Sequence, residues 1–354
     1  MRTNHSFYSK LALYLAEKNL GKTSNNPSVG CVIVKNDSVI SSGVTSVGGR
    51  PHAEVNALNK DINFTDSDMY VTLEPCTHYG ITPPCTNIIK RKRIKKVYYL
   101  FNDPDKRTQK KAKKILRGIF KLNHKNNKFK NFYKSYLLNK NNKFPLIDAK
   151  LALSKDFFTI NKKSKWITNS RSRKVAHLIR SNYDCIVSTS ESVNKDNSLL
   201  NCRIDGLNNL KPDLVIIDRS LKIRENLKLF DLSGKRKITI ITAINNKKKI
   251  SSFKKKRIKI IIIKKLVSKK DFNIFFQKIF KLNNGRILVE TGLVFLKKLF
   301  DFNLINNLHL FKSNVLLKNN GYNKCSIDFI KKLKFNNKVN VNLNNDKLFK
   351  IRIK

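Results

Sequence analysis

The sequence predicts an α/β protein made of two domains. At 354 residues the chain is long enough for two ordinary domains, each with a core of its own. In the second half, short apolar runs typical of buried strands alternate with helical patterns, which indicates a mostly parallel sheet. A connector rich in Lys and Asn, residues 122–143, leads to Phe144-Pro145. We therefore expect domains at residues 1–143 and 144–354.

The N-terminal domain should begin with an amphipathic helix, because Phe7, Leu11 and Leu15 recur at helical spacing. Apolar runs bounded by turn residues predict the strands that follow. The expected strands are residues 31–34, 39–43, 68–73 and 95–100. The expected helices are residues 6–20, 52–60, 86–93, a basic helix at 109–121, and a helical connector over 122–143.

The C-terminal domain repeats the alternation of strand and helix. The expected strands are residues 146–153, 186–188, 214–218, 238–243, 258–263, 287–290, 308–312 and 339–343. Helical patterns lie between several of them, as at residues 271–280 and before Arg180. Open α/β sheets bind their ligands where the strands end, so the residues that follow these strands are candidate site residues.

Residues 51–86 carry the side chains of a hydrolytic zinc site. His52, Cys76 and Cys85 supply three ligands that suit zinc, and catalytic zinc usually has three protein ligands with water in the fourth position. Glu54 can lie beside the metal without ligating it, and can move a proton from that water to a leaving amine. The pattern H-x-E followed by P-C is the signature of zinc-dependent nucleobase deaminases. A closed structural site is the alternative, with His78 as the spare ligand, but it leaves Glu54 without a role.

The spacing of the two cysteines narrows the choice among deaminases. Eight residues separate Cys76 from Cys85, where P-C-x-x-C deaminases have two. The intervening loop contains Gly80, Pro83 and Pro84, and should return the chain so that Cys85 opens the next helix. The segments P-H-A-E at 51–54 and T-L-E-P-C-T-H-Y-G-I-T-P-P-C at 72–85 resemble the hallmark of the bifunctional deaminase/reductases of riboflavin biosynthesis.

This resemblance implies a fold and a pair of reactions. The expected fold is a cytidine-deaminase-like three-layer domain followed by a dihydrofolate-reductase-like α/β domain. The first domain would use Zn²⁺ to hydrolyse an amino group from a diaminopyrimidinone that carries a phosphoribosylamino group. The second would use NADPH to reduce the ribosyl group to ribityl. A small phosphorylated pyrimidine is therefore the expected binding partner.

The resemblance also implies roles for individual residues. Glu54 would be catalytic, and Asn26 and Asp103 would contact the pyrimidine. In the C-terminal half, the residues implied to bind substrate are Ser164, Arg180, Leu200, Arg203 and Glu290. Those implied to bind the cofactor are Trp166, Ser192, Asp196 and Gly292. Arginine suits the substrate phosphate because its planar fork offers paired donors.

Several positions depart from the family pattern. Thr45 stands where a histidine is usual, and Lys106-Arg107-Thr108 replaces part of a phosphate-side loop. Leu293-Val294 replaces Pro-Thr after the glycine at 292, and Phe157-Phe158 replaces an Asp-Gly pair. These losses leave open a deaminase whose C-terminal half is a silent scaffold.

The net charge of +50 raises a further alternative, a tRNA or DNA base deaminase with a basic extension. However, the excess is almost all Lys, accompanied by Asn, Ile and Phe, whose codons are A/T-rich. The basic residues are spread along the chain without an aromatic-interleaved stripe. The cysteine spacing and the α/β second half also argue against a nucleic-acid partner.

Location and accessory features follow from composition. Six scattered cysteines do not form a disulfide framework, which favours a reducing cytoplasm. Residues 1–22 contain no apolar h-region and no small-residue cleavage site, and the sequence has no run of eighteen apolar residues. We therefore expect a cytoplasmic protein without membrane segments. A homo-oligomer is left open. The histidines outside the motif have no metal-ligand spacing and are expected to be ordinary surface or core residues: His5, His124, His177 and His309.

Overall fold

The computed structural model describes residues 4–122, 131–207 and 212–354. The chain divides into two compact units, Met1–Phe144 and Pro145–Lys354, so the division lies one residue after the expected domain boundary. Among the described residues, no helix has both the length and the apolar character needed to cross a membrane.

The N-terminal unit is built on a five-stranded sheet with strand order β2-β1-β3-β4-β5. Its strands are β1 (Gly30–Lys35), β2 (Ser38–Val44), β3 (Asp68–Leu73), β4 (Lys96–Phe101) and β5 (Ile119–Lys121). Strand β1 runs antiparallel to both β2 and β3, whereas β3, β4 and β5 are parallel to one another. The carboxyl ends of β3 and β4 therefore lie at one edge of the sheet, where a ligand site is expected.

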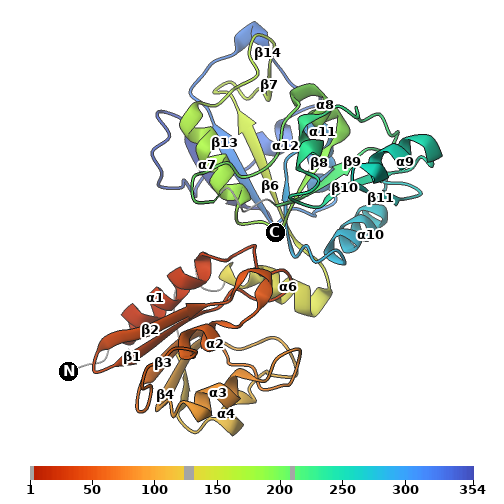
Figure 1. The fold of residues 1–354 in the computed structure, drawn as a ribbon. Helices are drawn as coiled ribbons and strands as arrows, with labels where there is room; N and C mark the ends of the chain where they lie inside the picture. Colours follow the sequence, from red (N-terminus) through yellow and green to blue (C-terminus); the bar gives the residue numbers. More distant parts are fainter. Residues whose placement is uncertain (1–3, 123–130, 208–211) are drawn as a thin grey trace. The chain divides into compact units, whose positions relative to one another are not determined.

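Helices cover both faces of this sheet, which gives three layers (Figure 1). The helices are α1 (His5–Glu17), α2 (Ala53–Leu58), α3 (Cys85–Arg91), α4 (Ala112–Ile115) and α6 (Lys134–Asn142), with a 3₁₀ turn η1 (Val47–Gly49). Alternate residues of β1 point to opposite faces. Val32 therefore packs with Ala12 of α1, while Ile33 packs with Ala57 of α2. A side chain at Gly30 would meet the carbonyl oxygen of Ala12 at 1.9 Å, so glycine permits the close approach of α1.

The expected basic helix at residues 109–121 is wrong. Only the short α4 forms there, and the chain then turns into β5, which adds a parallel edge strand to β4. Burial of Ile119 against the sheet outweighs the helical propensity of the lysines, since that side chain is 5% exposed. A side chain at Gly118 would lie 2.3 Å from the carbonyl oxygen of Lys95, so this turn requires glycine. Of the expected connector helix, residues 123–130 lie outside the described residues.

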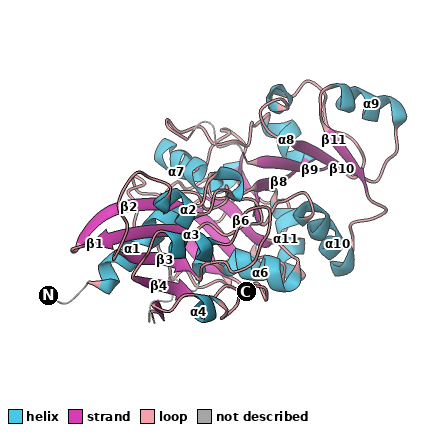
Figure 2. Ribbon diagram, turned by 60° about the horizontal axis from the view of Figure 1, so that its bottom comes forward, coloured by secondary structure: helices cyan, strands magenta, loops and turns pink. Residues whose placement is uncertain are grey.

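The C-terminal unit contains an eight-stranded sheet of order β11-β10-β9-β8-β12-β6-β13-β15. Its strands are β6 (Leu146–Leu153), β8 (Cys185–Thr189), β9 (Asp213–Ile217), β10 (Ile238–Thr242), β11 (Lys259–Ile262), β12 (Arg286–Val289), β13 (Asn307–Lys312) and β15 (Lys347–Arg352). All neighbouring pairs are parallel except β13 and β15, as the sequence pattern predicted for most of the sheet. A separate two-stranded sheet joins β7 (Ile160–Asn161) and β14 (Gly321–Tyr322). Figure 2 shows β8 to β11 side by side, with α9 beside β11.

Helices connect these strands and complete the core. They are α7 (Ser170–Arg180), α8 (Ser190–Asp196), α9 (Lys247–Lys255), α10 (Lys269–Phe280), α11 (Leu293–Asp301) and α12 (Asp328–Lys331), with short 3₁₀ turns η2 (Lys228–Leu232) and η3 (Lys318–Asn320). Helix α8 begins directly after β8, and α11 begins four residues after β12 ends. The helix N-termini therefore meet at the carboxyl ends of the two central strands.

The expected strand at residues 339–343 is also wrong. Its alternation of Val and Asn does bring Val339 and Val341 against the core, but the segment contributes only an isolated bridge from Lys338 to Phe349. Asn344 and Asn345 then adopt positive φ and reverse the chain. The next segment forms β15 and takes the place beside β13.

Candidate functional site

The three predicted zinc ligands lie together in the N-terminal unit. His52 is the residue immediately before α2, Cys76 follows β3, and Cys85 is the first residue of α3. Their ligand atoms all lie within 4.8 Å of one another. The Nδ1 atom of His52 is 3.3 Å from the sulfur of Cys85 and 3.7 Å from that of Cys76. Tetrahedral zinc with ordinary bond lengths places nitrogen and sulfur ligands about 3.5 Å apart, so this group fits zinc.

The surroundings of Cys76 favour the thiolate that a metal requires. Both cysteines are free of disulfide bonds, and the backbone N–H of Cys85 donates to the Cys76 sulfur at 3.2 Å. A hydrogen bond from the Cys85 thiol and the neighbouring His52 lower the pKa of the Cys76 thiol to about 4, although burial opposes them. Cys76 is therefore ionised at neutral pH before a metal adds its own charge.

Glu54 lies beside these ligands without belonging to the group of ligand atoms. It is the second residue of α2 and only 4% exposed. Burial raises the pKa of its carboxyl to about 7, although the nearby His52 opposes that rise. A carboxyl that titrates near neutrality can both accept and return a proton, as a general acid–base must.

No fourth protein ligand completes this group among the residues that the structure describes. His78, the spare candidate, lies with its Nδ1 atom 3.0 Å from the hydroxyl of Thr108 and is not one of the clustered ligands. A three-ligand group leaves a coordination position for water or substrate, which distinguishes catalytic from structural zinc sites.

Other predicted residues of this unit take distinct positions. The Asn26 side chain is 3.4 Å from the carbonyl oxygen of Gly49, in the loop before His52. Asp103 is buried after β4, where burial raises the pKa of its carboxyl to about 6 and the Tyr136 hydroxyl donates to it. Thr45, which stands at the position of the usual histidine, is 1% exposed, and its hydroxyl accepts a hydrogen bond from the N–H of Val29. It therefore braces the start of β1 and does not take over a substrate contact.

Glu74 has a role that sequence reasoning missed. Its carboxylate accepts hydrogen bonds from the backbone N–H groups of Asp103, Lys110 and Ala112, at 3.0 to 3.3 Å. It thereby holds the loop that follows β4. The only signal in the sequence was its place inside the T-L-E-P-C motif.

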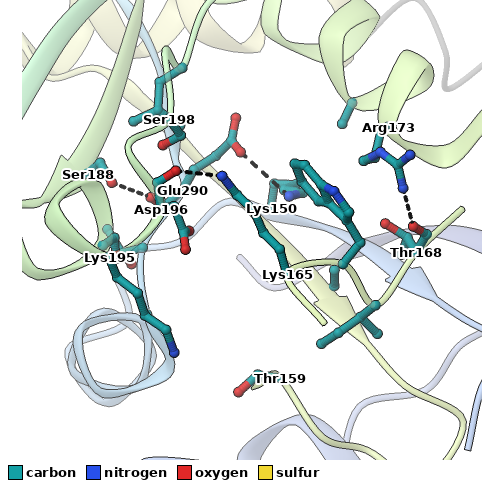
Figure 3. Close-up of a pocket in the computed structure, with 18 of the residues that line it drawn as sticks. Lys150, Thr159, Lys165, Thr168, Arg173, Ser188, Lys195, Asp196, Ser198 and Glu290 are labelled. Carbon is teal, nitrogen blue, oxygen red and sulfur yellow. Dashed lines mark hydrogen bonds and ion pairs between the residues drawn. The ribbon is translucent and has the colours of Figure 1, made fainter. Parts of the chain in front are cut away.

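The C-terminal unit contains a cavity of about 620 Å³ at the carboxyl ends of its central strands (Figure 3). All the residues that the resemblance assigned to this half line it: Ser164, Trp166, Arg180, Ser192, Asp196, Leu200, Arg203, Glu290 and Gly292. Gly292 lines the cavity as the N-cap of α11, and the N-terminus of a helix favours an anionic ligand. Leu293, which departs from the family pattern, is buried as the first residue of that helix.

A buried ion pair forms one wall of the cavity. The guanidinium of Arg180 binds both carboxylate oxygens of Glu290, with distances of 2.6 and 2.9 Å. The ammonium of Lys150 is 3.5 Å from the same carboxylate, and Figure 3 shows the two side chains pointing toward each other. Burial alone would raise the pKa of Glu290, but Arg180 and Lys150 lower it to about 2.

Two residues of this cavity were missed from the sequence. Lys150 lies on β6, where a charged residue inside a buried strand was an available signal. His177 was expected to be an ordinary residue, but it lines the cavity one helical turn before Arg180. His124 lies outside the described residues.

Comparison with known proteins identifies both halves. The family model for the cytidine and deoxycytidylate deaminase zinc-binding region matches residues 2–101. The family model for the RibD C-terminal domain matches residues 147–328, which is more than half of the chain. The chain belongs to the RibD family. It is a bifunctional enzyme of riboflavin biosynthesis, with a zinc-dependent deaminase activity and an NADPH-dependent reductase activity.

Curated relatives and solved structures agree with this assignment. The chain is 32% identical over 296 residues to the riboflavin biosynthesis protein RibD of Aquifex aeolicus, covering 80% of each chain. It is 31% identical over 341 residues to RibD of Buchnera aphidicola, covering 88% of each. The fold matches Acinetobacter baumannii RibD with a TM-score of 0.83 at 24% identity, over 98% of both chains. The N-terminal unit is thus cytidine-deaminase-like, and the C-terminal unit is a reductase with a dihydrofolate-reductase-like fold.

Membership of the RibD family argues against the two alternative functions that the sequence left open. It does not favour a nucleic-acid base deaminase with a basic extension, and it does not favour a silent C-terminal scaffold. The altered motifs of the second half therefore occur within a matched reductase domain.

Proposed function

We propose that residues 1–143 deaminate 2,5-diamino-6-(5-phosphoribosylamino)pyrimidin-4(3H)-one and that residues 144–354 then reduce its ribosyl group to ribityl. The observation that carries this proposal is the open group of His52, Cys76 and Cys85 with Glu54 buried at its side. A Thermotoga maritima protein of the same fold, with a TM-score of 0.82, bears the name of a phosphoribosylaminopyrimidine deaminase and phosphoribosylaminouracil reductase. The substrate that we propose for this chain is inferred from that similarity.

In the deaminase half, the chain supplies the proton transfers. The chemistry that bound zinc supplies is the activation of water as a nucleophile at neutral pH. Glu54 accepts a proton from the attacking water and returns it to the amino nitrogen, which leaves as ammonia. Asn26 and Asp103 hold the pyrimidine, and the burial of Glu54 keeps bulk water away from the transferred proton.

In the reductase half, the cavity holds substrate and cofactor together. When NADPH is bound it supplies the hydride, and the protein supplies position and charge. The cofactor side of the cavity comprises Trp166, Ser192, Asp196 and Gly292. The substrate side comprises Ser164, Arg180, Leu200, Arg203 and Glu290. The guanidinium of Arg180 is already paired with the carboxylate of Glu290. Arg203 is therefore the arginine that binds the substrate phosphate.

A two-signal assay tests this function. Purified protein is given the diaminopyrimidine with and without NADPH, and ammonia release and NADPH oxidation are followed separately. We expect ammonia without NADPH, and NADPH oxidation that starts only after deamination. Absence of ammonia release would remove the first half of the proposal, and absence of NADPH oxidation with the deaminated pyrimidine would remove the second.

A further inference from the structure

Three polar contacts surround the His177 ring. Its Nδ1 atom is 2.8 Å from the backbone carbonyl oxygen of Asn201 and 3.3 Å from Nη1 of Arg180, and its Nε2 atom is 3.2 Å from Nη2 of Arg203. Nη1 of Arg180 donates to the same carbonyl oxygen at 3.1 Å, so Arg180 and Nδ1 share that acceptor. A carbonyl oxygen can only accept a hydrogen bond, so Nδ1 carries the proton and donates it. A guanidinium can only donate, so Nε2 of the neutral ring accepts from Arg203.

Arg203 is held at both terminal nitrogens. Besides its bond to His177, its Nη1 atom donates to the side-chain oxygen of Asn201 at 2.8 Å. In the described part of the chain, Arg203 forms no ion pair with a carboxylate, whereas Arg180 is neutralised by Glu290. The charge of Arg203 is therefore available to an anion that enters the cavity.

The charges around His177 keep its ring neutral at physiological pH. Burial lowers the pKa of the His177 imidazole, and the neighbouring Arg180 and Arg203 lower it further, to about 4. Arg180 lies on the same helix, Arg203 comes from the loop after α8, and Glu290, at the end of β12, acts in the opposite direction. The lone pair of Nε2 is thus present throughout the neutral range.

We propose that His177 is a positioning residue for the reductase substrate: by accepting a hydrogen bond from Arg203, it holds that guanidinium ready for the substrate phosphate. The inference rests on the proposed role of Arg203 in binding that phosphate. A long arginine side chain loses rotamer freedom when it binds, and a partner that orders it beforehand lowers that cost. His177 acts through Arg203 and does not itself touch the reacting atoms.

Kinetics of the reductase step test the proposal. Arg203→Ala should raise the KM for the deaminated, phosphorylated pyrimidine by about 10- to 100-fold, because a hydrogen-bonded charge is lost. His177→Leu should raise the same KM by about 5- to 10-fold with kcat within about twofold of the parent. His177→Gln, whose amide can donate to Asn201 and accept from Arg203, should restore most of the affinity. The double variant should bind hardly more weakly than Arg203→Ala alone, because the two residues act through one contact.

Controls separate the possible failures. Arg171→Ala, at an exposed arginine of the same helix outside the cavity, should leave the KM unchanged. Ammonia release, catalysed by the other unit, normalises the amount of active protein, and the urea-unfolding midpoint followed by circular dichroism reports that the C-terminal unit is folded. His177→Ala replaces the leucine variant if that one is unstable. If Arg203→Ala leaves the KM unchanged, the phosphate role of Arg203 is wrong. If Arg203→Ala raises it but His177→Leu does not, or if His177→Gln behaves like His177→Leu, the positioning role is wrong.

Discussion

Glu54→Gln is expected to lower the rate of ammonia release by about 10²- to 10⁴-fold, the usual contribution of a general acid–base. Glutamine has nearly the same shape but cannot take a proton from water. Because Glu54 is not one of the three clustered ligands, the variant should still bind zinc. The measurement pairs the rate of ammonia release with the zinc content of the same preparation.

Two controls accompany the Glu54 variant. Asp61→Asn makes the same carboxyl-to-amide change at an exposed position shortly after α2, and should deaminate at the parent rate. Given the deaminated pyrimidine, Glu54→Gln should still oxidise NADPH, because the reductase cavity lies in the other unit. Deamination at the parent rate by zinc-loaded Glu54→Gln would remove Glu54 from the mechanism.

Arg180→Leu is expected to destabilise the C-terminal unit by about 3–5 kcal/mol, since removing one partner of a buried ion pair leaves the other charge uncompensated. Arg180 and Glu290 have side chains only 12% and 7% exposed. The midpoint of urea unfolding, followed by circular dichroism, measures the change. The rate of NADPH oxidation should also fall in this variant, because Glu290 lines the cavity and loses its ion-pair partner.

A second ion pair in the same unit provides the comparison. Lys297→Leu breaks the exposed pair between Lys297 and Asp301, and should change stability by less than about 0.5 kcal/mol. The stabilities of the two variants should also respond differently to a fall in pH. The folded-state pKa of Glu290, about 2, lies below its ordinary value of 4.5, so its contribution is present above pH 4.5 and is lost as the pH falls toward 2. Arg180→Leu should weaken that dependence, because only Lys150 then lowers the pKa of Glu290, and Lys297→Leu should keep it in full. Equal stability of the two variants would show that the buried pair contributes no more than the exposed one.

The zinc centre could be predicted because its geometry is local to one motif. His52 and Glu54 are separated by one residue at the start of a helix, and the Gly- and Pro-containing loop brings Cys85 back to Cys76. The members of the reductase cavity were also found by motif. They converge because they follow adjacent parallel strands: Ser192 and Asp196 come after β8, and Glu290 comes after β12.

The missed features depend on contacts between distant segments. Glu74 is identified only by the backbone groups that it holds, up to 38 positions away. The role of His177 depends on its hydrogen bond with Arg203, 26 residues later in the chain. The sequence spacing of the two residues does not predict that contact. Likewise, β5 and β15 form because each pairs with an exposed edge of a sheet, β4 and β13 respectively. Local strand propensity does not predict such a pairing.

Elemental analysis of the purified chain shows whether His52, Cys76 and Cys85 hold a metal. We expect one zinc ion per chain, lost in Cys85→Ala and retained in Cys325→Ala, whose cysteine lies outside the ligand group. A parent chain without bound metal, or a Cys85→Ala variant with its full zinc content, would contradict this expectation.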